Sequence, residues 1–341
     1  MSSKILFIGN LCDLPYNCVH LLRENGFDAQ LLVVEKTVKK SEPWIINCKP
    51  GLFGWLKRLR FMFKADVLVA TAMAVNYAWL FRILGKRVIA YSMGSDFRRV
   101  YFQKDAAGWL MRRGFKVSNA IAYSNPDQTK KFAAEGFKPK FIPFTTPLDI
   151  QTKTKIHKKT VFFCPSRIDW SGPSAKDTDL FIKGFAGFLQ GLPVKQRGAF
   201  ELRLVEWGND IEKARRLVKK LGMQKNVRFL QFMNYTKLLH EYSECDAVID
   251  QFNVKSIGTA GTKAMACGKP LFVNIDKKAY KICFKKTPPI YNCINSKQVQ
   301  VALKKNDKRD YSRRGADCKK WALEKHSHKL IVQRFAKLLN S

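Results

Sequence analysis

Acidic residues are scarce in this chain of 341 residues, which contains 27 Asp and Glu against 62 Lys and Arg and has a formal net charge of +35. Residues 1–150 contain 23 basic and 11 acidic residues, and residues 151–341 contain 39 and 16. Because both halves are basic, the charge is not that of a tail joined to a neutral protein. Such a charge attracts nucleic acid or an anionic membrane, and it also serves general solubility.

Long apolar runs and metal-binding patterns are also missing. No apolar run approaches the roughly 18 residues that cross a bilayer, and the run that follows Ser3 is too short for a signal peptide, so we expect a cytoplasmic protein. The nine cysteines form no Cys-x-x-Cys pair, and no two histidines have the spacing of metal ligands. We therefore expect reduced thiols and no metal site.

Hydrophobic residues make up 46% of the chain, which is enough for two domains of ordinary size. Short apolar strands alternate with helices, and this predicts an α/β fold with parallel sheets covered by helices. In the first half we expect strands at residues 4–9, 29–34, 66–70, 87–91, 120–123 and 141–142, and helices at 17–25, 53–64, 75–84, 106–113 and 126–135. In the second half we expect strands at 160–164, 201–206, 227–230, 247–250 and 271–275, and helices at 179–190, 210–221 and 237–243.

A linker is expected at residues 145–159, which are polar and contain Pro147 and several lysines. This places an N-terminal domain at residues 1–150 and a C-terminal domain at 151–311. One long basic helix is expected at 312–341. Loops at the carboxyl ends of parallel strands bind ligands, so two such domains predict a cleft between them.

The segment from Gly258 to Pro270 has the clearest functional pattern. Gly258-Thr259-Ala260-Gly261 is typical of a glycine-rich loop, and a short helix rich in Ala and Met follows and ends at Gly268. Such a loop lets backbone N–H groups approach a phosphate, and the helix dipole favours an anion there. The same residues also fit an ordinary joint between a loop, a helix and a strand.

Residues 262–270, which read Thr-Lys-Ala-Met-Ala-Cys-Gly-Lys-Pro, resemble the C-terminal signature of the retaining glycosyltransferases of family 4, in the group 1 class. This resemblance implies the GT-B fold, in which two Rossmann-like, doubly wound domains face each other across a cleft and a C-terminal helix often crosses back to the first domain. It also implies that residues 1–150 bind the acceptor and that residues 151–311 bind the nucleotide sugar. The chain departs from the signature at the family's glutamate, which holds the donor ribose. Lys263 stands there, and an ammonium cannot accept hydrogen bonds from the ribose hydroxyls.

The resemblance extends to residues 162–170 and 176–179, and it implies that Arg167 and Lys176 bind the donor diphosphate. Cations placed there stabilise the charge of the leaving nucleoside diphosphate without a metal. Asp250-Gln251-Phe252 resembles a motif of one branch, in which the following glycine-rich loop receives the donor sugar. Phe232 and Met233 occupy the place of the loop along the nucleobase, although Phe232 also fits a core position. The donor-binding residues implied are Gly9, Phe232, Met233, Gly258, Thr259, Gly261, Thr262 and Lys263.

Residues 91–96 resemble the family's His-Gly-Ser-Asp turn, with Met93 in place of the histidine. A thioether cannot replace an imidazole as a hydrogen-bond donor or proton carrier. Asp96 is retained. It is a candidate catalytic residue that polarises an acceptor hydroxyl, and it equally fits a helix cap.

A separate pattern over residues 52–64 indicates a membrane surface. Apolar residues, including Phe53 and Phe63, repeat at helical spacing, with Trp55 at their margin. The basic residues between them are Lys57, Arg58, Arg60 and Lys64. Helices of this composition lie in the interface of anionic membranes, and a helix packed on its own sheet with a solvated basic face has the same pattern.

These patterns predict a metal-independent, retaining glycosyltransferase of hexosyltransferase type. It would need no cofactor and would move a sugar from a nucleotide sugar to a hydroxyl of a lipid-linked or cell-surface glycan, as a peripheral protein at the inner face of the membrane. Two alternatives remain. A glycosyltransferase of the same fold that modifies bases in DNA would explain the net charge. A catalytically degenerate polyanion-binding or partner subunit would explain Lys263 and Met93.

Overall fold

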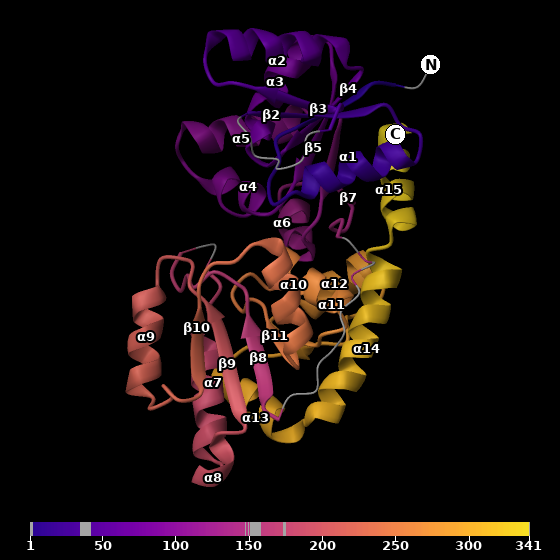
Figure 1. Ribbon diagram of the computed structural model, residues 1–341. Coiled ribbons are helices and arrows are strands. Elements are labelled where there is room, and N and C mark those ends of the chain that lie inside the picture. Colours follow the sequence, from indigo (N-terminus) through magenta and orange to yellow (C-terminus); the bar gives the residue numbers. More distant parts are fainter. Residues whose placement is uncertain are drawn as a thin grey trace. The chain divides into compact units, whose positions relative to one another are not determined.

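The computed structural model describes residues 3–34, 42–146, 148, 150, 158–172 and 175–340. The chain divides into two compact units, of which the first comprises Met1–Thr146 with His326–Ser341 and the second comprises Pro147–Lys325 (Figure 1). Most of the predicted linker, including Pro147, lies outside the described residues.

The first unit contains a sheet of seven parallel strands in the order β3-β2-β1-β4-β5-β6-β7. Its strands are β1 (Ile5–Ile8), β2 (Ala29–Val34), β3 (Ile45–Cys48), β4 (Val67–Thr71), β5 (Arg87–Ser92), β6 (Ala120–Tyr123) and β7 (Lys140–Phe141). The strand order reverses beside β1, as in doubly wound folds, whose ligands bind at the carboxyl edge near this reversal.

The helices of the first unit cover both faces of this sheet. They are α1 (Leu14–Glu24), α2 (Leu52–Lys64), η1 (Ala72–Tyr77), α3 (Ala78–Ile83), α4 (Ser95–Arg98), η2 (Val100–Phe102), α5 (Ala106–Val117), η3 (Pro126–Gln128), α6 (Thr129–Ala134) and α15 (His328–Asn340). Side chains alternate along a strand, so Ile5 and Phe7 of β1 pack on α1 and α15. The neighbouring Ile8 lines a cavity beside α2 and α3.

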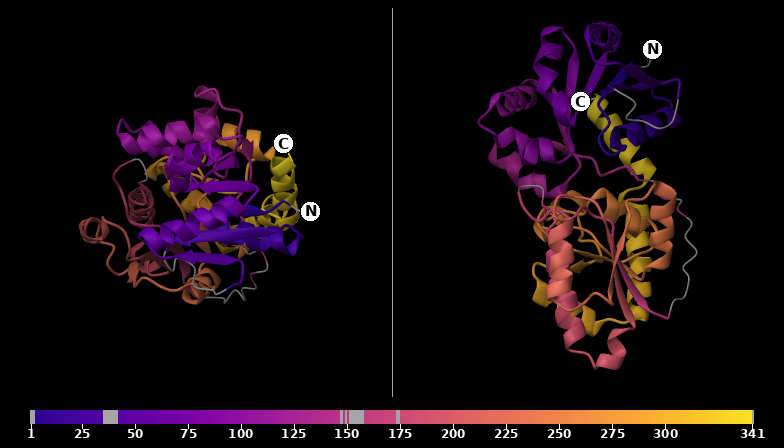
Figure 2. Two further views of the ribbon diagram at one scale, coloured as in Figure 1. Left: turned by 90° about the horizontal axis from the view of Figure 1, so that it is seen from above. Right: turned by 60° about the vertical axis from the view of Figure 1, so that its left-hand side comes forward.

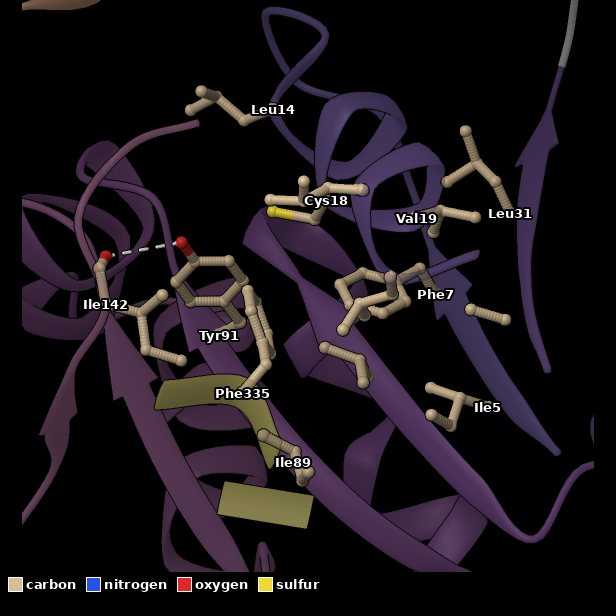
Figure 3. Packing of buried hydrophobic residues seen from close by; sticks show 14 of the residues in the cluster. Ile5, Phe7, Leu14, Cys18, Val19, Leu31, Ile89, Tyr91, Ile142 and Phe335 are labelled. Atoms are coloured by element: carbon tan, nitrogen blue, oxygen red, sulfur yellow. Dashed lines mark hydrogen bonds between the residues drawn. The ribbon is translucent and has the colours of Figure 1, made fainter. Parts of the chain in front are cut away.

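Helix α15 comes from the far end of the chain and completes the core of the first unit (Figure 2). The ring of Phe335 lies 5.8 Å from that of Phe7 and 5.6 Å from that of Tyr91, both nearly edge to face (Figure 3). The Tyr91 hydroxyl donates a hydrogen bond to the carbonyl of Ile142 at 3.4 Å. Arg334 donates to the carbonyl of Phe141 at 2.9 Å, which fixes the helix beside β7.

The second unit contains a sheet of six parallel strands in the order β10-β9-β8-β11-β12-β13. Its strands are β8 (Thr160–Cys164), β9 (Phe200–Val205), β10 (Val227–Leu230), β11 (Ala247–Ile249), β12 (Leu271–Val273) and β13 (Tyr291–Asn292). Its helices are α7 (Asp179–Gln190), α8 (Val194–Arg197), α9 (Ile211–Lys220), α10 (Tyr235–Glu244), α11 (Thr259–Ala266), α12 (Lys277–Phe284), α13 (Ser296–Lys305) and α14 (Lys308–Lys325).

The α/β prediction of two parallel sheets flanked by helices is confirmed. The elements that were not predicted from the sequence include β3, α4, α8, α12, β13 and α13. One helix was expected near the C-terminus, whereas α14 ends at Lys325 and α15 begins at His328. The hydroxyl of Ser327 accepts a hydrogen bond from the N–H of Leu330 and starts the second helix. Among the described residues, no helix is long and apolar enough to cross a membrane.

We predict that His326 makes the stability of the protein depend on pH. This side chain is buried, with Nδ1 3.1 Å from the carbonyl oxygen of Phe144, and burial lowers its pKa from 6.5 to about 4. The unfolded chain therefore takes up a proton below pH 6.5 while the folded chain does not. We expect the free energy of unfolding to fall by about 3 kcal/mol from this group between pH 6.5 and 4.

The measurement is urea denaturation at pH 7 and pH 4.5 of the wild type, of His326→Asn and of His240→Asn, a control at an exposed histidine of α10. His326→Asn should lose stability less steeply than the wild type as the pH falls, and the control should follow the wild type. Equal slopes for all three proteins would contradict the prediction.

Candidate functional site

The candidate site lies at the carboxyl edge of the second sheet, where the strand order reverses between β8 and β11. The loop after β8 carries Arg167 and Lys176, and the loop after β11 leads into α11. In doubly wound sheets this reversal separates the loops of neighbouring strands and leaves room for a ligand. The sequence and the topology therefore indicate the same place.

A buried carboxylate, that of Asp250, organises the site. It follows β11 directly, and Oδ2 accepts a hydrogen bond from the N–H of Gly258 at 2.6 Å. Oδ1 accepts from the hydroxyl of Ser166 at 3.3 Å. Burial raises the pKa of Asp250, and the nearby ammonium of Lys176 opposes this rise. The carboxylate thus ties the loop after β8 to the start of α11.

Lys176 is held in place by both its backbone and its side chain. Its N–H donates to the carbonyl of Asp169 at 2.7 Å, and its carbonyl accepts from the N–H of Phe252 at 2.9 Å. The ammonium donates to Oε1 of Gln251, whose Nε2 donates to the carbonyl of Ser256 at 2.6 Å. These contacts position a cation against the segment that leads into α11.

Helix α11 begins at Thr259, and its N-cap is Gly258, which has no side chain that could accept a hydrogen bond from the helix. The first N–H groups of a helix have no partner within it, and they carry the positive end of the helix dipole. This end of α11 lies at the same edge as Lys176. A cation and a helix N-terminus together form a site suited to a phosphate.

The structure corrects the predicted glycine-rich loop. Only Gly258 precedes the helix, whereas Thr259, Gly261 and Thr262 belong to α11, and Gly258 has an ordinary φ of −83°. A Cβ on Gly261 would lie 2.4 Å from Oδ2 of Asp250. This glycine is therefore explained by the close approach of the Asp250 carboxylate, not by backbone flexibility.

Arg167 lies on the same loop as Lys176 and is partly exposed. Its guanidinium forms an ion pair of 3.1 Å with Asp169, whose Oδ1 also accepts from the N–H of Asn209 at 2.7 Å. Arg167 is thus anchored near the backbone of the site while its side chain remains accessible to an anionic ligand.

Exposed aromatic side chains lie beside the same edge. Phe232, after β10, is 70% exposed, and its ring lies 5.7 Å from that of Trp207, which follows β9. The core interpretation of Phe232 is therefore wrong. Lys263, on the second turn of α11, lies 5.1 Å from the ring of Tyr235 at the start of α10. Met233, between Phe232 and α10, is partly buried.

The sequence analysis assigned no role to Ser166, Trp207 or Tyr235. Ser166 and Trp207 both follow predicted strands closely, and this position was the only available signal for them. Tyr235 could not be predicted as a site residue, because its contact with Lys263 joins two residues that are distant in the sequence.

Gly9 and Asp96 lie in the first unit. Asp96 is 1% exposed and accepts hydrogen bonds from the hydroxyl of Ser92 and from the N–H groups of Met93 and Gly94. Burial raises its pKa. Asp96 is not the cap of α4, because it lies within that helix and the N-cap is Gly94. Its carboxylate instead holds the turn of residues 92–94, and its catalytic role stays a prediction. Gly9 has a φ of +92°, which favours glycine, at the end of β1.

Met93, at the position of the family's histidine, is 6% exposed and belongs to the core that includes residues of α1 and α15. Its carbonyl accepts a hydrogen bond from the amide of Asn125 at 2.9 Å. The methionine therefore packs as a core residue of the first unit.

The comparisons with known proteins agree with this geometry. Residues 148–280 match the family model described as glycosyl transferases group 1, a segment that includes Arg167, Lys176 and all of α11. No curated protein matches the chain in sequence.

Several solved structures resemble the whole chain. The Anabaena protein HepE in complex with UDP and glucose has a TM-score of 0.74 and 14% identity, with 99% of both chains covered. A sucrose-phosphate synthase from Thermosynechococcus elongatus has a TM-score of 0.73 and 12% identity, over 99% of this chain and 98% of that one. The lipopolysaccharide outer core galactosyltransferase WaaB has a TM-score of 0.65 and 13% identity, over 99% of both chains. The likeness shows the GT-B fold, and with the family model it supports the group 1 glycosyltransferase family.

We predict that Gly261→Ala destabilises the protein, although alanine is favoured over glycine within a helix by about 1 kcal/mol. The new Cβ would lie 2.4 Å from Oδ2 of Asp250 and 2.8 Å from Cγ2 of Ile257, and overpacking of this kind costs about 1–3 kcal/mol. We expect a lower melting temperature by calorimetry. The control is Gly187→Ala in α7, where the Cβ would meet only the end of the Gln300 side chain, 3.1 Å away. An unchanged or higher melting temperature for Gly261→Ala would contradict the geometry of the site.

Proposed function

We propose that the protein is an active, retaining glycosyltransferase that moves a hexosyl group from a nucleotide sugar to a hydroxyl of a lipid-linked or cell-surface glycan, without a metal. One observation carries the proposal. The ammonium of Lys176 is fixed beside the start of α11, within the segment that matches the group 1 family model.

The chemical role of this arrangement follows from the leaving group. When the bond between the sugar and the diphosphate breaks, negative charge develops on the diphosphate oxygen. Lys176, Arg167 and the first N–H groups of α11 are fixed in advance and stabilise that charge without reorganising, which is the most effective form of electrostatic catalysis. The proposed site needs no metal to neutralise the diphosphate.

The aromatic residues suit the nucleoside end of the donor. Phe232 is exposed and backed by Trp207, so its face is available to a base. Lys263 belongs to α11, the helix that would bind the diphosphate. Its ammonium lies over the ring of Tyr235, which belongs to α10. An ammonium donates hydrogen bonds to ribose hydroxyls instead of accepting them, and it adds positive charge beside the phosphates. Since HepE was solved with UDP and glucose, UDP sugars are the first donors to test.

We predict that Arg167→Ala and Lys176→Ala each lower kcat for donor turnover by on the order of 100-fold, because each removes a cation aimed at the leaving group. Release of the nucleoside diphosphate from a panel of nucleotide sugars is the measurement. Arg216→Ala and Lys220→Ala remove exposed cations of α9 in the same unit and serve as controls.

The two controls should turn over at the wild-type rate, and the melting temperature of each variant shows whether it is folded. Near-wild-type kcat in both site variants would remove the diphosphate assignment. A wild-type protein that neither binds nor turns over any nucleotide sugar would favour the degenerate binding subunit.

We also propose that α2 places the enzyme on an anionic membrane, at the cytoplasmic face. Its interior contacts are few: Gly54 and Met62 are its only buried residues among those described. Phe53 is 86% exposed, and the other exposed apolar residues of the helix are Leu52, Trp55, Leu56 and Phe63. A helix packed on its own sheet would bury these side chains, so their exposure supports an interfacial role.

A second aromatic and basic cluster lies on α5 of the same unit. The guanidinium of Arg113 lies 5.4 Å from the rings of both Trp79, on α3, and Trp109. Trp109 is exposed. Amphipathic aromatic rings beside cations are typical of surfaces that contact lipid headgroups.

We predict that replacing Lys57, Arg60 and Lys64 by Gln lowers the affinity for vesicles containing anionic lipid by on the order of 100-fold, since each cation near such a surface contributes roughly 1 kcal/mol. Vesicle sedimentation is the measurement. The control replaces Lys277, Lys278 and Lys281 of α12, which changes the net charge equally in the second unit. Equal losses in both triple variants would show that net charge, not α2, determines binding. A wild-type protein that ignores vesicles but binds DNA, with affinity that falls steeply as salt rises, would favour the DNA-modifying alternative.

A further inference from the structure

The first unit contains a cavity of about 500 Å³ between α2 and the segment formed by η1 and α3. It lies at the carboxyl edge of the sheet, because Ile8 and Gly9 end β1, and Val33 and Val34 end β2. This volume is within the usual range of small-molecule pockets, and the carboxyl edge is where doubly wound sheets bind their ligands.

Apart from Asn10, Arg58 and the hydroxyl of Tyr77, the described side chains that line the cavity are apolar. Its floor includes the buried Ile8, Leu32 and Val33, and its sides come from Leu59 of α2 and Leu80 of α3. Such a surface favours a hydrocarbon ligand, because burying apolar groups away from water is favourable.

One cation belongs to this lining. Among the described residues that line the cavity, Arg58 of α2 is the only charged one. Its Nε donates to the carbonyl of Gly54 at 3.2 Å, so the side chain is folded back along the helix. A guanidinium beside an apolar cavity suits a ligand that joins a hydrocarbon chain to a phosphate.

The rim of the cavity is amphipathic. Trp55, Met73 and Tyr77 line it and are exposed, whereas its floor is buried. Trp55 also belongs to the exposed apolar face of α2 described above. The cavity is therefore continuous with the face proposed to contact the membrane, from which a lipid chain would enter.

We propose that this cavity binds the lipid anchor of the acceptor, with its hydrocarbon chain against Leu59 and Leu80 and its phosphate on Arg58. This proposal rests on the proposed glycosyltransferase function and specifies the acceptor as a phosphate-bearing lipid. Neither the membrane nor the nucleotide donor is needed for the binding step itself.

The experiment is calorimetric titration of the full chain, without vesicles, using octyl phosphate below its micelle concentration as the probe. Octyl glucoside provides the chain without the charge, and inorganic phosphate provides the charge without the chain. Octyl phosphate should bind at least tenfold more tightly than either. Equal binding of inorganic phosphate, or no binding of octyl phosphate, would overturn the proposal.

Two kinds of variant test the two halves of the ligand. Ala74→Phe and Leu80→Phe fill the cavity from η1 and α3 and should weaken octyl phosphate binding at least tenfold. Either variant suffices if the other fails to fold.

The Arg58 variants test the phosphate. Arg58→Gln should cause a similar loss for octyl phosphate and none for octyl glucoside, with Arg58→Lys partly restoring binding. Arg82→Gln is the matched control, because Arg82 is exposed on α3 and is not among the lining residues of the cavity. Unchanged binding in both filling variants, or an equal loss in Arg82→Gln, would overturn the proposal.

Donor turnover separates this proposal from the one on which it rests. The proposed diphosphate site lies in the second unit, so we expect the cavity variants to retain hydrolysis of the nucleotide sugar. If octyl phosphate fails to bind while donor hydrolysis persists, the lipid acceptor is wrong and the glycosyltransferase assignment stands. If octyl phosphate binds as expected while no nucleotide sugar is hydrolysed, the cavity stands and the enzymatic assignment falls.

Discussion

The need to satisfy one buried carboxylate, that of Asp250, determines much of the candidate site. A charge removed from water is costly unless hydrogen bonds and an opposite charge compensate for it. Here the compensation comes from the N–H of Gly258, the hydroxyl of Ser166 and the ammonium of Lys176. The Lys176 ammonium that compensates this charge lies near the start of α11. The close approach of the carboxylate also requires glycine at position 261. The cation and the helix terminus suited to a phosphate are thus placed together by the packing of a neighbouring anion.

The fold was largely predictable from the sequence because most strands and helices are local patterns of apolar residues. Strand β13 and helix α12 were not predicted, for different reasons. Strand β13 has only two residues, which is too short to show alternation. Helix α12 did carry a signal, since Ala279, Tyr280, Cys283 and Phe284 are buried at helical spacing after the N-cap Asp276.

The candidate site was less predictable, because its details depend on residues that are distant in sequence. A glycine that serves a loop and a glycine that makes room for a carboxylate look alike in the sequence, so Gly261 was assigned to a loop. The exposure of Phe232, the burial of Met93 and the contact of Lys263 with Tyr235 all depend on tertiary packing. The sequence did indicate the carboxyl edge of the second sheet, where Phe232, Lys263 and Tyr235 lie.

The contribution of α15 to the first core has a consequence for biosynthesis. Phe335, Ile331 and Leu338 fill the space beside Phe7 and Tyr91, yet the ribosome makes them only after the whole of the second unit. The amino-terminal unit therefore emerges first but stays incomplete, with apolar surface uncovered, while the residues that follow it are synthesised and begin to fold. Domains usually finish folding during translation in their order along the chain. Here the first unit can finish folding only after the second unit has been made. A chain released before α15 is made would expose the uncovered apolar surface to aggregation or degradation.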